Sequence, residues 1–558
     1  MLNILYTSLI LLFLDIIVIK DFDYLISNLS ERFFVNLTLS SFALFIVLIL
    51  FSKLKKYILY IILIIPIMVQ ATYFEIYRKM ISSFGFQTFF EDSGMVISLW
   101  LENINILKTV FLITLIWFLV EKIDKIEISK KVTFSLIFLL ISIYSLIVFS
   151  WYSVSNFQNS IISYYGSLFD SIKLGAYSNF KIDRPKIEKS KRENLPNIIY
   201  IIGESLVLNH TSLYGYSRDT TPNLLKLEKS EKIVKFENAT SIGTKTRLSV
   251  PYMLVGLQGI DPKGEIYKYP TISNYMKSIG YKTFFITSQD LSWGGLKDFL
   301  IDSDIDSFVN GTKYNSNARV HKGTDDLIMV ENEILPIIEN EKKPFFMIYQ
   351  MDGNHYPYSK HSPKEFKKWQ ENGLNSINSY DNSVLYSDTV LSKIIEKMRL
   401  KYSNSWVFYS TDHGQNLGGK GGMFNDNFEK DVIHNTMFIS PPHQYFVKLQ
   451  TLQNTPISQV DIVPTILDLV NIKPIKALDG FSLLKSILEN RVRISSTYMP
   501  TLHNTPEATI IFPNLNYWYI NFSKMSVTLE DGKKSIPYKD LDKIYKEMFD
   551  KKLSKGNQ

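Results

Sequence analysis

Long apolar runs are concentrated in the first 155 residues of the chain. Five of them occur, at positions 3–19, 34–51, 57–73, 104–120 and 132–152. A helix crosses a bilayer with about 17–25 largely apolar residues, so each run has the length of a membrane span. The first run contains Asp15 and is the weakest, but it lacks a charged n-region and a small-residue cleavage site, which disfavours a cleaved signal peptide. Buried helices of a soluble domain are the alternative, and five runs at this density favour a five-helix transmembrane domain over residues 1–152.

The short loops between these runs differ in their lysine and arginine content, which sets membrane orientation. The basic residues of the second and fourth loops are Lys53, Lys55, Lys56, Lys122, Lys125, Lys130 and Lys131. The first loop has Lys20 and Arg32, and the longer third loop has mainly Arg78 and Lys79. The even loops and the N-terminus are therefore expected in the cytoplasm. Five crossings would place everything after about Trp151 outside the cytoplasmic membrane, in the periplasm.

Residues 153–193 are polar and end in the basic segment KIDRPKIEKSKRENLP. This composition is typical of a solvated linker. A basic stretch lying on anionic lipid headgroups is the alternative, since each Lys or Arg near such a surface adds about 1 kcal/mol. The remaining residues, 194–558, are expected to form a periplasmic catalytic domain.

The domain after the linker alternates short β-rich runs with helical patterns. The runs NIIYIIGES, KTFFITSQD, KPFFMIYQMDG and SWVFYSTDHG lie at 197–205, 282–290, 343–353 and 405–414. Between the last two, residues 380–398 carry apolar residues at helical spacing. Apolar strands separated by helices predict an α/β domain whose mostly parallel sheet is covered by helices on both faces. Ligands of such sheets bind beyond the carboxyl ends of the strands.

Composition excludes several classes of chemistry. The chain has 558 residues and no cysteine, which rules out disulfides, thiolate zinc sites and cysteine nucleophiles. An oxidising compartment stays possible, because a domain of about 350 residues buries enough core without disulfides. The net charge of +7 comes from scattered residues, so nucleic acid is not an expected partner.

Acidic and imidazole side chains follow the predicted strands. They are Glu204, Asp290, His355, Asp412 and His413. A single carboxylate after a strand is often only a helix cap. Carboxylate oxygens and imidazole nitrogens are also ligands of Zn²⁺, which prefers four of them in a tetrahedron. Glu204, Asp412 and His413 would supply three ligands, and a reacting hydroxyl would supply the fourth.

The segment ATSIGTKTRLSVPYM at 239–253 offers such hydroxyls. Zinc coordination lowers the pKa of a hydroxyl and makes an alkoxide accessible for attack on phosphorus or sulfur. Spacing alone leaves Thr244, Thr246 and Ser249 open as the nucleophile, and a polar loop beside a helix N-terminus is the non-catalytic alternative.

Several segments resemble one family in the family's own order. GESLVLNHTSLYGYSRDTTPNL (203–224) resembles the start of the catalytic domain of phosphoethanolamine transferases that modify lipid A, the colistin-resistance enzymes among them. The other similar segments are GTKTRLSVPYM (243–253), DGNHYPYSKHSPKEF (352–366), SYDNSVLYSDTVLSKII (379–395), STDHGQNLG (410–418), VIHNTMFIS (432–440) and VDIVPTILDLVNI (460–472). The last is similar to the closing segment of the wider alkaline phosphatase and sulfatase superfamily.

This resemblance implies a zinc enzyme of the inner membrane with two half-reactions. Thr246 would be the nucleophile that attacks phosphatidylethanolamine, and Glu204, Thr246, Asp412 and His413 would hold Zn²⁺. Lipid A or another envelope glycan would then accept phosphoethanolamine, which lowers binding of polymyxin-type cationic peptides. His355 and His434 would bind a second metal or the substrate, although a lone histidine is more often structural.

The chain also departs from the family pattern. Ile242 and Tyr252 stand where the family often has a disulfide around the nucleophile loop, so packing is expected to hold that loop. Lys297 is a weak match to a phosphate-binding lysine. Thr88 and Asp92 keep the spacing of a lipid-headgroup site, where Phe84 replaces an expected Asn. The tail after about residue 495 matches no family segment.

Three rival functions remain, of which two are enzymes and the third is non-catalytic. A phosphoglycerol transferase of the lipoteichoic-acid synthase type shares the five spans and the zinc-bound Thr, but the SLYGYSRDTTP segment favours phosphoethanolamine transfer. A membrane-tethered phosphatase or sulfatase is the second. A sulfatase needs a Cys or Ser that becomes formylglycine, whereas this chain has no Cys and a Thr cannot undergo that conversion. A non-catalytic envelope scaffold, the third, would not need the Glu/Thr/Asp/His set.

Overall fold

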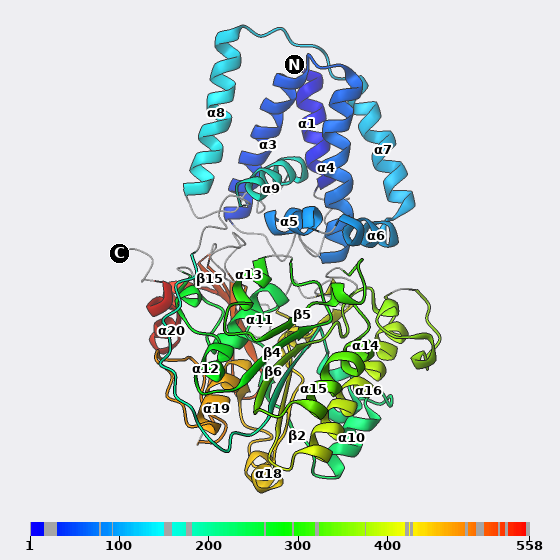
Figure 1. The fold of residues 1–558 in the computed structure, drawn as a ribbon. Helices are drawn as coiled ribbons and strands as arrows, with labels where there is room; N and C mark the ends of the chain where they lie inside the picture. The colour runs from blue at the N-terminus through cyan, green and yellow to red at the C-terminus, as the bar shows by residue number, and fades with distance from the viewer. Residues whose placement is uncertain are drawn as a thin grey trace. The chain divides into compact units, whose positions relative to one another are not determined.

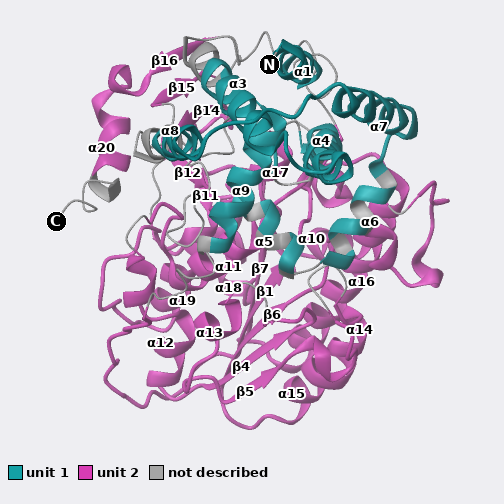
Figure 2. Cartoon of the chain, turned by 90° about the horizontal axis from the view of Figure 1, so that it is seen from above, with its two compact units in different colours: residues 1–179, 419–423, 501–505 teal, residues 180–418, 424–500, 506–558 magenta. Residues whose placement is uncertain are grey.

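The computed structural model divides into two compact units (Figure 2): residues 1–179 with 419–423 and 501–505, and residues 180–418, 424–500 and 506–558. The described residues are 2–15, 31–77, 80–91, 93–149, 159–174, 181–261, 264–292, 295–318, 323–373, 375–418, 423–424, 428–485, 489–497, 507–522, 525–529 and 534–553. Each unit is described below by itself.

The first unit is helical, and the described parts of all five apolar runs form helices in it. Its helices are α1 (Leu2–Leu14), α3 (Glu31–Phe51), α4 (Lys56–Tyr77), α5 (Ser83–Glu91), α6 (Ser93–Asn103), α7 (Ile106–Glu121), α8 (Lys130–Phe149) and α9 (Ser160–Leu174). Within the described residues, α4 is the one helix long and apolar enough to cross a membrane, while Leu2–Leu14 and Leu37–Phe51 are shorter apolar helices. The helices therefore lie where the apolar runs predicted them. Their lengths do not establish how many of them cross a membrane.

Polar groups are buried inside this helical unit. Asp15 is 2% exposed and accepts hydrogen bonds from the Asn159 side-chain nitrogen at 2.8 Å and the Ser160 amide at 2.9 Å. Gln70 of α4 accepts from the Ile81 amide at 2.8 Å. Asp15 makes the first apolar run the weakest candidate for a membrane span. The hydrogen bonds from Asn159 and Ser160 offset the cost of burying its carboxylate.

A seven-stranded sheet forms the centre of the second unit (Figure 1). Its order is β2 (Val234–Phe236), β10 (Met437–Ser440), β7 (Trp406–Thr411), β1 (Ile198–Gly203), β6 (Phe345–Gln350), β4 (Lys282–Thr287) and β5 (Ser307–Val309). The five strands from β7 to β5 are parallel, whereas β10 is antiparallel to both β7 and β2. The sheet is thus mixed, and most of its strands run parallel, as predicted.

Helices cover both faces of this sheet (Figures 1 and 2). One group comprises α10 (Pro222–Lys229), α14 (Asp326–Met329), α15 (Leu335–Asn340) and α16 (Ile377–Lys401). The other comprises α11 (Thr246–Val255), α12 (Ile272–Ser278), α13 (Leu296–Leu300) and α19 (Ile462–Leu469). This double cover explains why β1, β6 and β7 are buried at every position and are apolar without alternation.

The strand register brings the site segments to one edge of the sheet. Gly203, the last residue of β1, lies opposite Thr411, the last residue of β7. Ile202 of β1 lies opposite Gln350 at the end of β6. Since these strands are parallel, Glu204, Met351 and Asp412 all leave the sheet at its carboxyl edge.

The tail after residue 490 forms a second, antiparallel sheet. Its strands are β12 (Arg493–Ser496), β13 (Glu507–Ile511), β14 (Tyr517–Asn521), β15 (Ser526–Thr528) and β16 (Ser535–Pro537), followed by helix α20 (Lys543–Leu553). Ile510, Ile520 and Phe549 belong to its own hydrophobic core. Smaller elements complete the unit: β3 (Ala239–Thr240), β8 (Asn416–Leu417), β9 (Met423–Phe424), β11 (Ile457–Ser458), α17 (Lys430–Ile433) and α18 (His443–Gln450).

Candidate metal centre and nucleophile

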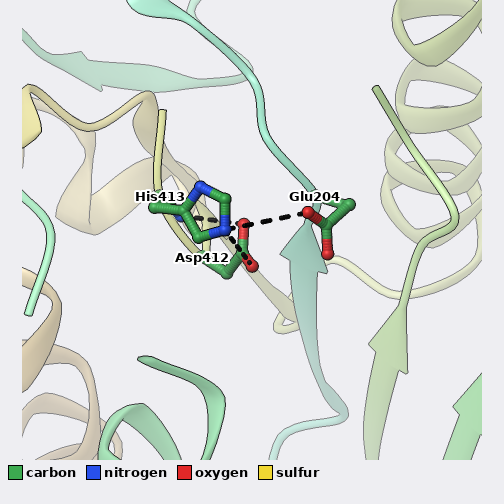
Figure 3. Close-up of side chains that lie close together, drawn as sticks. All are labelled: Glu204, Asp412 and His413. Atoms are coloured by element: carbon green, nitrogen blue, oxygen red, sulfur yellow. Dashed lines mark hydrogen bonds and ion pairs between the residues drawn. The ribbon is translucent and has the colours of Figure 1, made fainter. Parts of the chain in front are cut away.

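Glu204, Asp412 and His413 converge beyond the ends of β1 and β7 (Figure 3). One ligand atom of each lies within 4.8 Å of the others. The His413 Nε2 atom is 3.2 Å from Asp412 Oδ2 and 3.9 Å from Glu204 Oε1. All three side chains are buried, with exposed fractions of 2%, 0% and 0% in the same order. The two carboxylates and the imidazole predicted at separate strand ends therefore form one cluster.

Thr246 is the first residue of α11 and adds a hydroxyl to this cluster. Its Oγ1 donates to Glu204 Oε2 at 3.1 Å and lies 3.3 Å from His413 Nε2. A helix N-terminus carries partial positive charge from its free amide groups, which favours a nearby anion such as a phosphoryl group. Among the described residues, the Thr244 and Ser249 hydroxyls are buried without a hydrogen-bond partner. Thr246 is thus the hydroxyl of this loop that contacts the carboxylate–imidazole cluster.

The loop before α11 is held without a disulfide. Ile242 and Tyr252 are fully buried, and the Ile242 amide donates to the Gln459 side-chain oxygen at 2.6 Å. Gly243 forms a parallel bridge with Ser496 of the tail sheet. A Cβ atom at Gly243 would lie 2.2 Å from Leu248 Cδ2 and 2.8 Å from the Ser496 carbonyl oxygen, so only glycine fits. Packing and backbone contacts therefore fix the loop, and the tail sheet contributes to them.

The hydrogen bonds of the cluster fit a bound cation. His413 Nδ1 donates to the Gly414 carbonyl at 2.7 Å, so a neutral imidazole turns the lone pair of Nε2 toward the carboxylates. Asp412 Oδ1 accepts from the amides of Ser205 and His413, at 3.0 and 2.8 Å. Its Oδ2 is buried with no hydrogen-bond partner among the described residues. Buried lone pairs that face one another are costly unless a cation lies between them.

Electrostatics within the cluster point the same way. Burial, and next the negative charge of Glu204, raise the pKa of Asp412 above its ordinary value. Two buried carboxylates at this separation repel each other when both are ionised. A cation would remove that repulsion and hold both in the charged form. The donor set of carboxylate, imidazole and hydroxyl suits Zn²⁺, which would be held by Glu204, Thr246, Asp412 and His413.

Two residues that the sequence analysis missed orient Glu204. Gln289 donates from Nε2 to Glu204 Oε2 at 3.1 Å, and the Ser205 hydroxyl donates to Glu204 Oε1 at 2.7 Å. Gln289 is the second residue after β4, a position that the strand-end rule includes. The adjacent Asp290 was selected instead, and it accepts from Asn310 Nδ2 at 3.0 Å in a surface turn, outside the cluster.

The two predicted accessory histidines have separate environments. His355 is partly exposed, and its Nδ1 donates to the Tyr356 carbonyl at 2.5 Å. Its ring centroid lies 6.3 Å from that of His361, whose Nδ1 is 2.9 Å from Asp352 Oδ2. His434 is buried and donates from Nε2 to the Glu237 carbonyl at 2.8 Å. Neither histidine belongs to the cluster of Glu204, Asp412 and His413.

Lys297 does not belong to the cluster. Lys297 lies in the first turn of α13, exposed, with its ammonium 5.8 Å from the centre of the Phe308 ring. Thr88 is a residue of α5, and Asp92 lies outside the described residues.

Comparisons with known proteins agree with this architecture. Residues 196–472 match the family model described as Sulfatase. Over 264 residues the chain is 27% identical to Kdo(2)-lipid A phosphoethanolamine 7''-transferase of Escherichia coli K12, covering 45% of this chain and 43% of that protein. Over 315 residues it is 27% identical to phosphatidylethanolamine transferase Mcr-1 from Escherichia coli, covering 52% and 56%. The matches thus span about half the length of these relatives.

A solved structure covers more of the chain. The integral membrane protein lipooligosaccharide phosphoethanolamine transferase A (EptA) of Neisseria meningitidis matches with a TM-score of 0.60 and 18% identity, over 84% of this chain and 95% of that one. The chain carries a sulfatase domain of the alkaline phosphatase superfamily, as its sequence motifs predicted. Within that superfamily, its curated relatives are phosphoethanolamine transferases.

Proposed function

We propose that this protein transfers phosphoethanolamine from phosphatidylethanolamine to lipid A or another envelope glycan. The observation that carries the proposal is the contact of Thr246 Oγ1 with Glu204 and His413. Beside it, Asp412 Oδ2 lies 3.2 Å from His413 Nε2 and has no hydrogen-bond partner among the described residues. The domain that holds this centre is shared with transferases named for lipid A and phosphatidylethanolamine.

The reaction has two displacements at phosphorus. In the first, Thr246 Oγ1 forms a bond to the phosphorus of phosphatidylethanolamine, the bond to the diacylglycerol oxygen breaks, and that oxygen leaves with a proton as diacylglycerol. In the second, a phosphate or hydroxyl of the acceptor attacks the phosphoethanolamine–Thr246 ester, and the Thr246 oxygen regains its proton. Every atom of the phosphoethanolamine group passes from donor to acceptor.

The centre orients and activates Thr246 for this chemistry. Zn²⁺ held by Glu204, Asp412 and His413 would lower the pKa of the Thr246 hydroxyl and stabilise negative charge at phosphorus. Glu204 Oε2 accepts the Thr246 hydroxyl proton in a hydrogen bond, which directs an oxygen lone pair away from the carboxylate. The position of Thr246 at the start of α11 adds the positive end of the helix to the same region.

The polarity of the helical unit supports a membrane location. Its surface exposes large apolar side chains, among them Leu9 and Phe13 on α1, Leu107 and Phe118 on α7, and Phe134 and Phe138 on α8. On α9 the usual pattern of a helix in water is reversed, with apolar residues exposed and polar residues buried. Tyr165, Phe169 and Ile172 are exposed, whereas Ser160, Ser163, Ser167 and Ser171 are buried. Small polar residues inside and apolar residues outside are typical of helices in lipid rather than in water.

The exposed apolar side chains of α1, α7 and α8 favour five membrane spans at 1–152. The loop charges favour a periplasmic catalytic domain at 194–558, after a linker at 153–193 that contains α9. Such a domain would face phosphatidylethanolamine and lipid A from the same side of the inner membrane. Anchoring the enzyme in the bilayer that contains its lipid donor raises the effective concentration of that donor.

Mass spectrometry of envelope glycolipids tests the proposed function. Cells with the wild-type protein should show a phosphoethanolamine increment on lipid A or a core sugar, and cells with Thr246→Ala should lack it. A glycerophosphate increment would instead establish the phosphoglycerol transferase. Release of inorganic phosphate from phosphate esters, without transfer to a glycan, would establish the phosphatase.

A further inference from the structure

The turn between Glu204 and Val207 has a strained backbone that contacts two of the proposed metal ligands. Ser205 has a φ of 54°, a left-handed conformation that is uncommon for a residue with a side chain. Its hydroxyl donates to Glu204 Oε1 at 2.7 Å, and its amide donates to Asp412 Oδ1 at 3.0 Å. The conformation of Ser205 therefore determines where both carboxylates point. Left-handed residues persist only where surrounding contacts enforce them.

The Tyr380 hydroxyl of α16 supplies such contacts. It donates to the Ser205 carbonyl at 2.7 Å and accepts from the Val207 amide at 2.7 Å. One oxygen thus spans the turn and satisfies a buried carbonyl and a buried amide. Tyr380 is fully buried, so water cannot readily replace its hydroxyl in either bond.

Tyr380 is itself fixed in place. Its ring meets those of Tyr358 and His210 edge to face, at centroid distances of 4.9 and 5.4 Å. The adjacent Asp381 is 2.8 Å from His210 Nδ1 and accepts from Arg218 Nη1 at 2.7 Å. The first turns of α16 are thereby joined to the segment that follows Glu204. Of the described contacts of Tyr380, its hydroxyl bonds are the ones that reach the Ser205 turn directly.

We propose that Tyr380 is a positioning residue of the metal centre: its hydroxyl holds Ser205 in the conformation that aims Glu204 and Asp412 at one cation. The inference rests on the proposed function, because it requires a metal at this cluster. Residues behind metal ligands set the orientation of those ligands, and their loss lowers metal affinity by about 10–100-fold. The described hydrogen bonds and ring contacts of Tyr380 reach none of the proposed ligands, so it acts through the backbone of the turn.

The test compares Tyr380→Phe with Tyr200→Phe in the detergent-solubilised full chain. Tyr200 is a matched control, because it is fully buried in β1 and its hydroxyl has no hydrogen-bond partner among the described residues. Zn²⁺ affinity is measured by competition with a chromophoric chelator, and ligand geometry by the visible absorption of the Co²⁺-loaded protein. Tyr380→Phe should weaken Zn²⁺ binding about 10–100-fold and change the Co²⁺ spectrum, while Tyr200→Phe should match the wild type in both.

Equal Zn²⁺ affinity and equal Co²⁺ spectra for Tyr380→Phe and the wild type would overturn the role of Tyr380 and leave the metal centre standing. A wild type that binds neither metal would overturn the metal centre and this inference together. If Tyr380→Phe fails to fold, hydrogen exchange of the wild type replaces it. Zn²⁺ should slow exchange of the Val207 amide, and an exchange rate unaffected by Zn²⁺ would refute the coupling of the turn to the metal.

Discussion

At the scale of single residues, three hydroxyls of one loop differ in what surrounds them. Thr244, Thr246 and Ser249 are all buried, and Thr246 alone of these three contacts Glu204 and His413. Because Thr246 is the first residue of α11, no preceding helical turn offers its hydroxyl a carbonyl. The chemistry of the centre therefore depends on where α11 begins.

Thr246→Ala should abolish transfer and leave folding nearly intact, since it removes one hydroxyl that has no role in the core. Incubation of the wild type with phosphatidylethanolamine, followed by peptide mass spectrometry, should find the adduct on the peptide containing Thr246. Circular dichroism and thermal unfolding of Thr246→Ala provide the folding control. An adduct on Thr244 or Ser249 would show that the nucleophile is misassigned.

The separate environments of the histidines predict a division of roles. Asp412→Ala should empty the metal centre, whereas His355→Ala and His434→Ala should retain the metal, because neither imidazole lies in the cluster. Transfer to the acceptor should fall by about 10²–10⁴-fold if either histidine assists acid–base chemistry or charge stabilisation. Elemental analysis beside single-turnover adduct formation distinguishes the two effects. Loss of metal from either histidine variant would assign that histidine to the primary centre.

The sequence predicted the site residues that can be recognised from their immediate neighbours in the chain. Glu204, Asp412 and His413 each directly follow a buried strand, and that position is visible in the sequence. Gln289 also follows a strand, but its uncharged amide is not a preferred zinc ligand, and its contact with Glu204 depends on the order of β4 and β1 in the sheet. Ser205 and Tyr380 act through backbone conformation and through a helix more than 170 residues away, as their separation of 175 residues shows.

At the scale of elements, α16 contacts the segment after Glu204 at three positions along the helix. Tyr380 contacts the turn at Ser205, Asp381 contacts His210 and Arg218, and Asp388 contacts α10. Asp388 accepts from the amides of Asn223 and Leu224 at 3.0 and 2.8 Å, in the first turn of α10. The helix thus caps α10 and supports the turn of the metal centre.

Asp388 should make stability pH-dependent. Burial raises its pKa to about 7 from an ordinary value of 3.8. Because the folded state then binds the proton more tightly than the unfolded state, the stability contributed by protonated Asp388 is present below about pH 4 and is lost as pH rises to about 7. The change is on the order of 2–4 kcal/mol.

Asp388→Asn mimics the neutral acid and should flatten this decline. The measurement is chemical unfolding of metal-free wild type and variant between pH 4.5 and 7.5. The variant should approach or exceed the wild-type stability at pH 7.5, and not at pH 4.5. Parallel curves for the two proteins would refute a raised pKa at Asp388.

Helices and strands were predictable where their segments are long and have a clear apolar pattern. The apolar runs and the long periodic segment at 380–398 appear as helices, and four buried strands appear where continuous apolar runs predicted them. The tail sheet was missed, because its strands have three to five residues and β14, its central strand, shows no alternation of buried and exposed positions. Such strands are defined by their partners, not by their own sequence.

At the scale of the whole molecule, the two units have opposite surface polarity. The second unit buries its apolar strands under helices, whereas the first exposes apolar side chains and buries serines, Gln70 and Asp15. The arrangement of the second unit is favoured in water, and that of the first unit is favoured in lipid. Within the described residues, length and apolar composition together identify one span candidate, α4, so surface polarity and loop charge carry the argument for a multi-span unit.

The loop charges predict a definite topology that reporter fusions can test. A reporter active only in the periplasm, fused after residue 193, should be active, because five crossings from a cytoplasmic N-terminus end outside the cytoplasm. The same reporter fused after residue 125, in the lysine-rich loop between α7 and α8, should be inactive, and a cytoplasm-only reporter should give the reverse pattern. This second fusion point is the matched control, because it differs from the first by one span. Cytoplasmic activity after residue 193 would place the Thr246 centre on the side of the membrane away from lipid A, and the proposed acceptor would have to be abandoned.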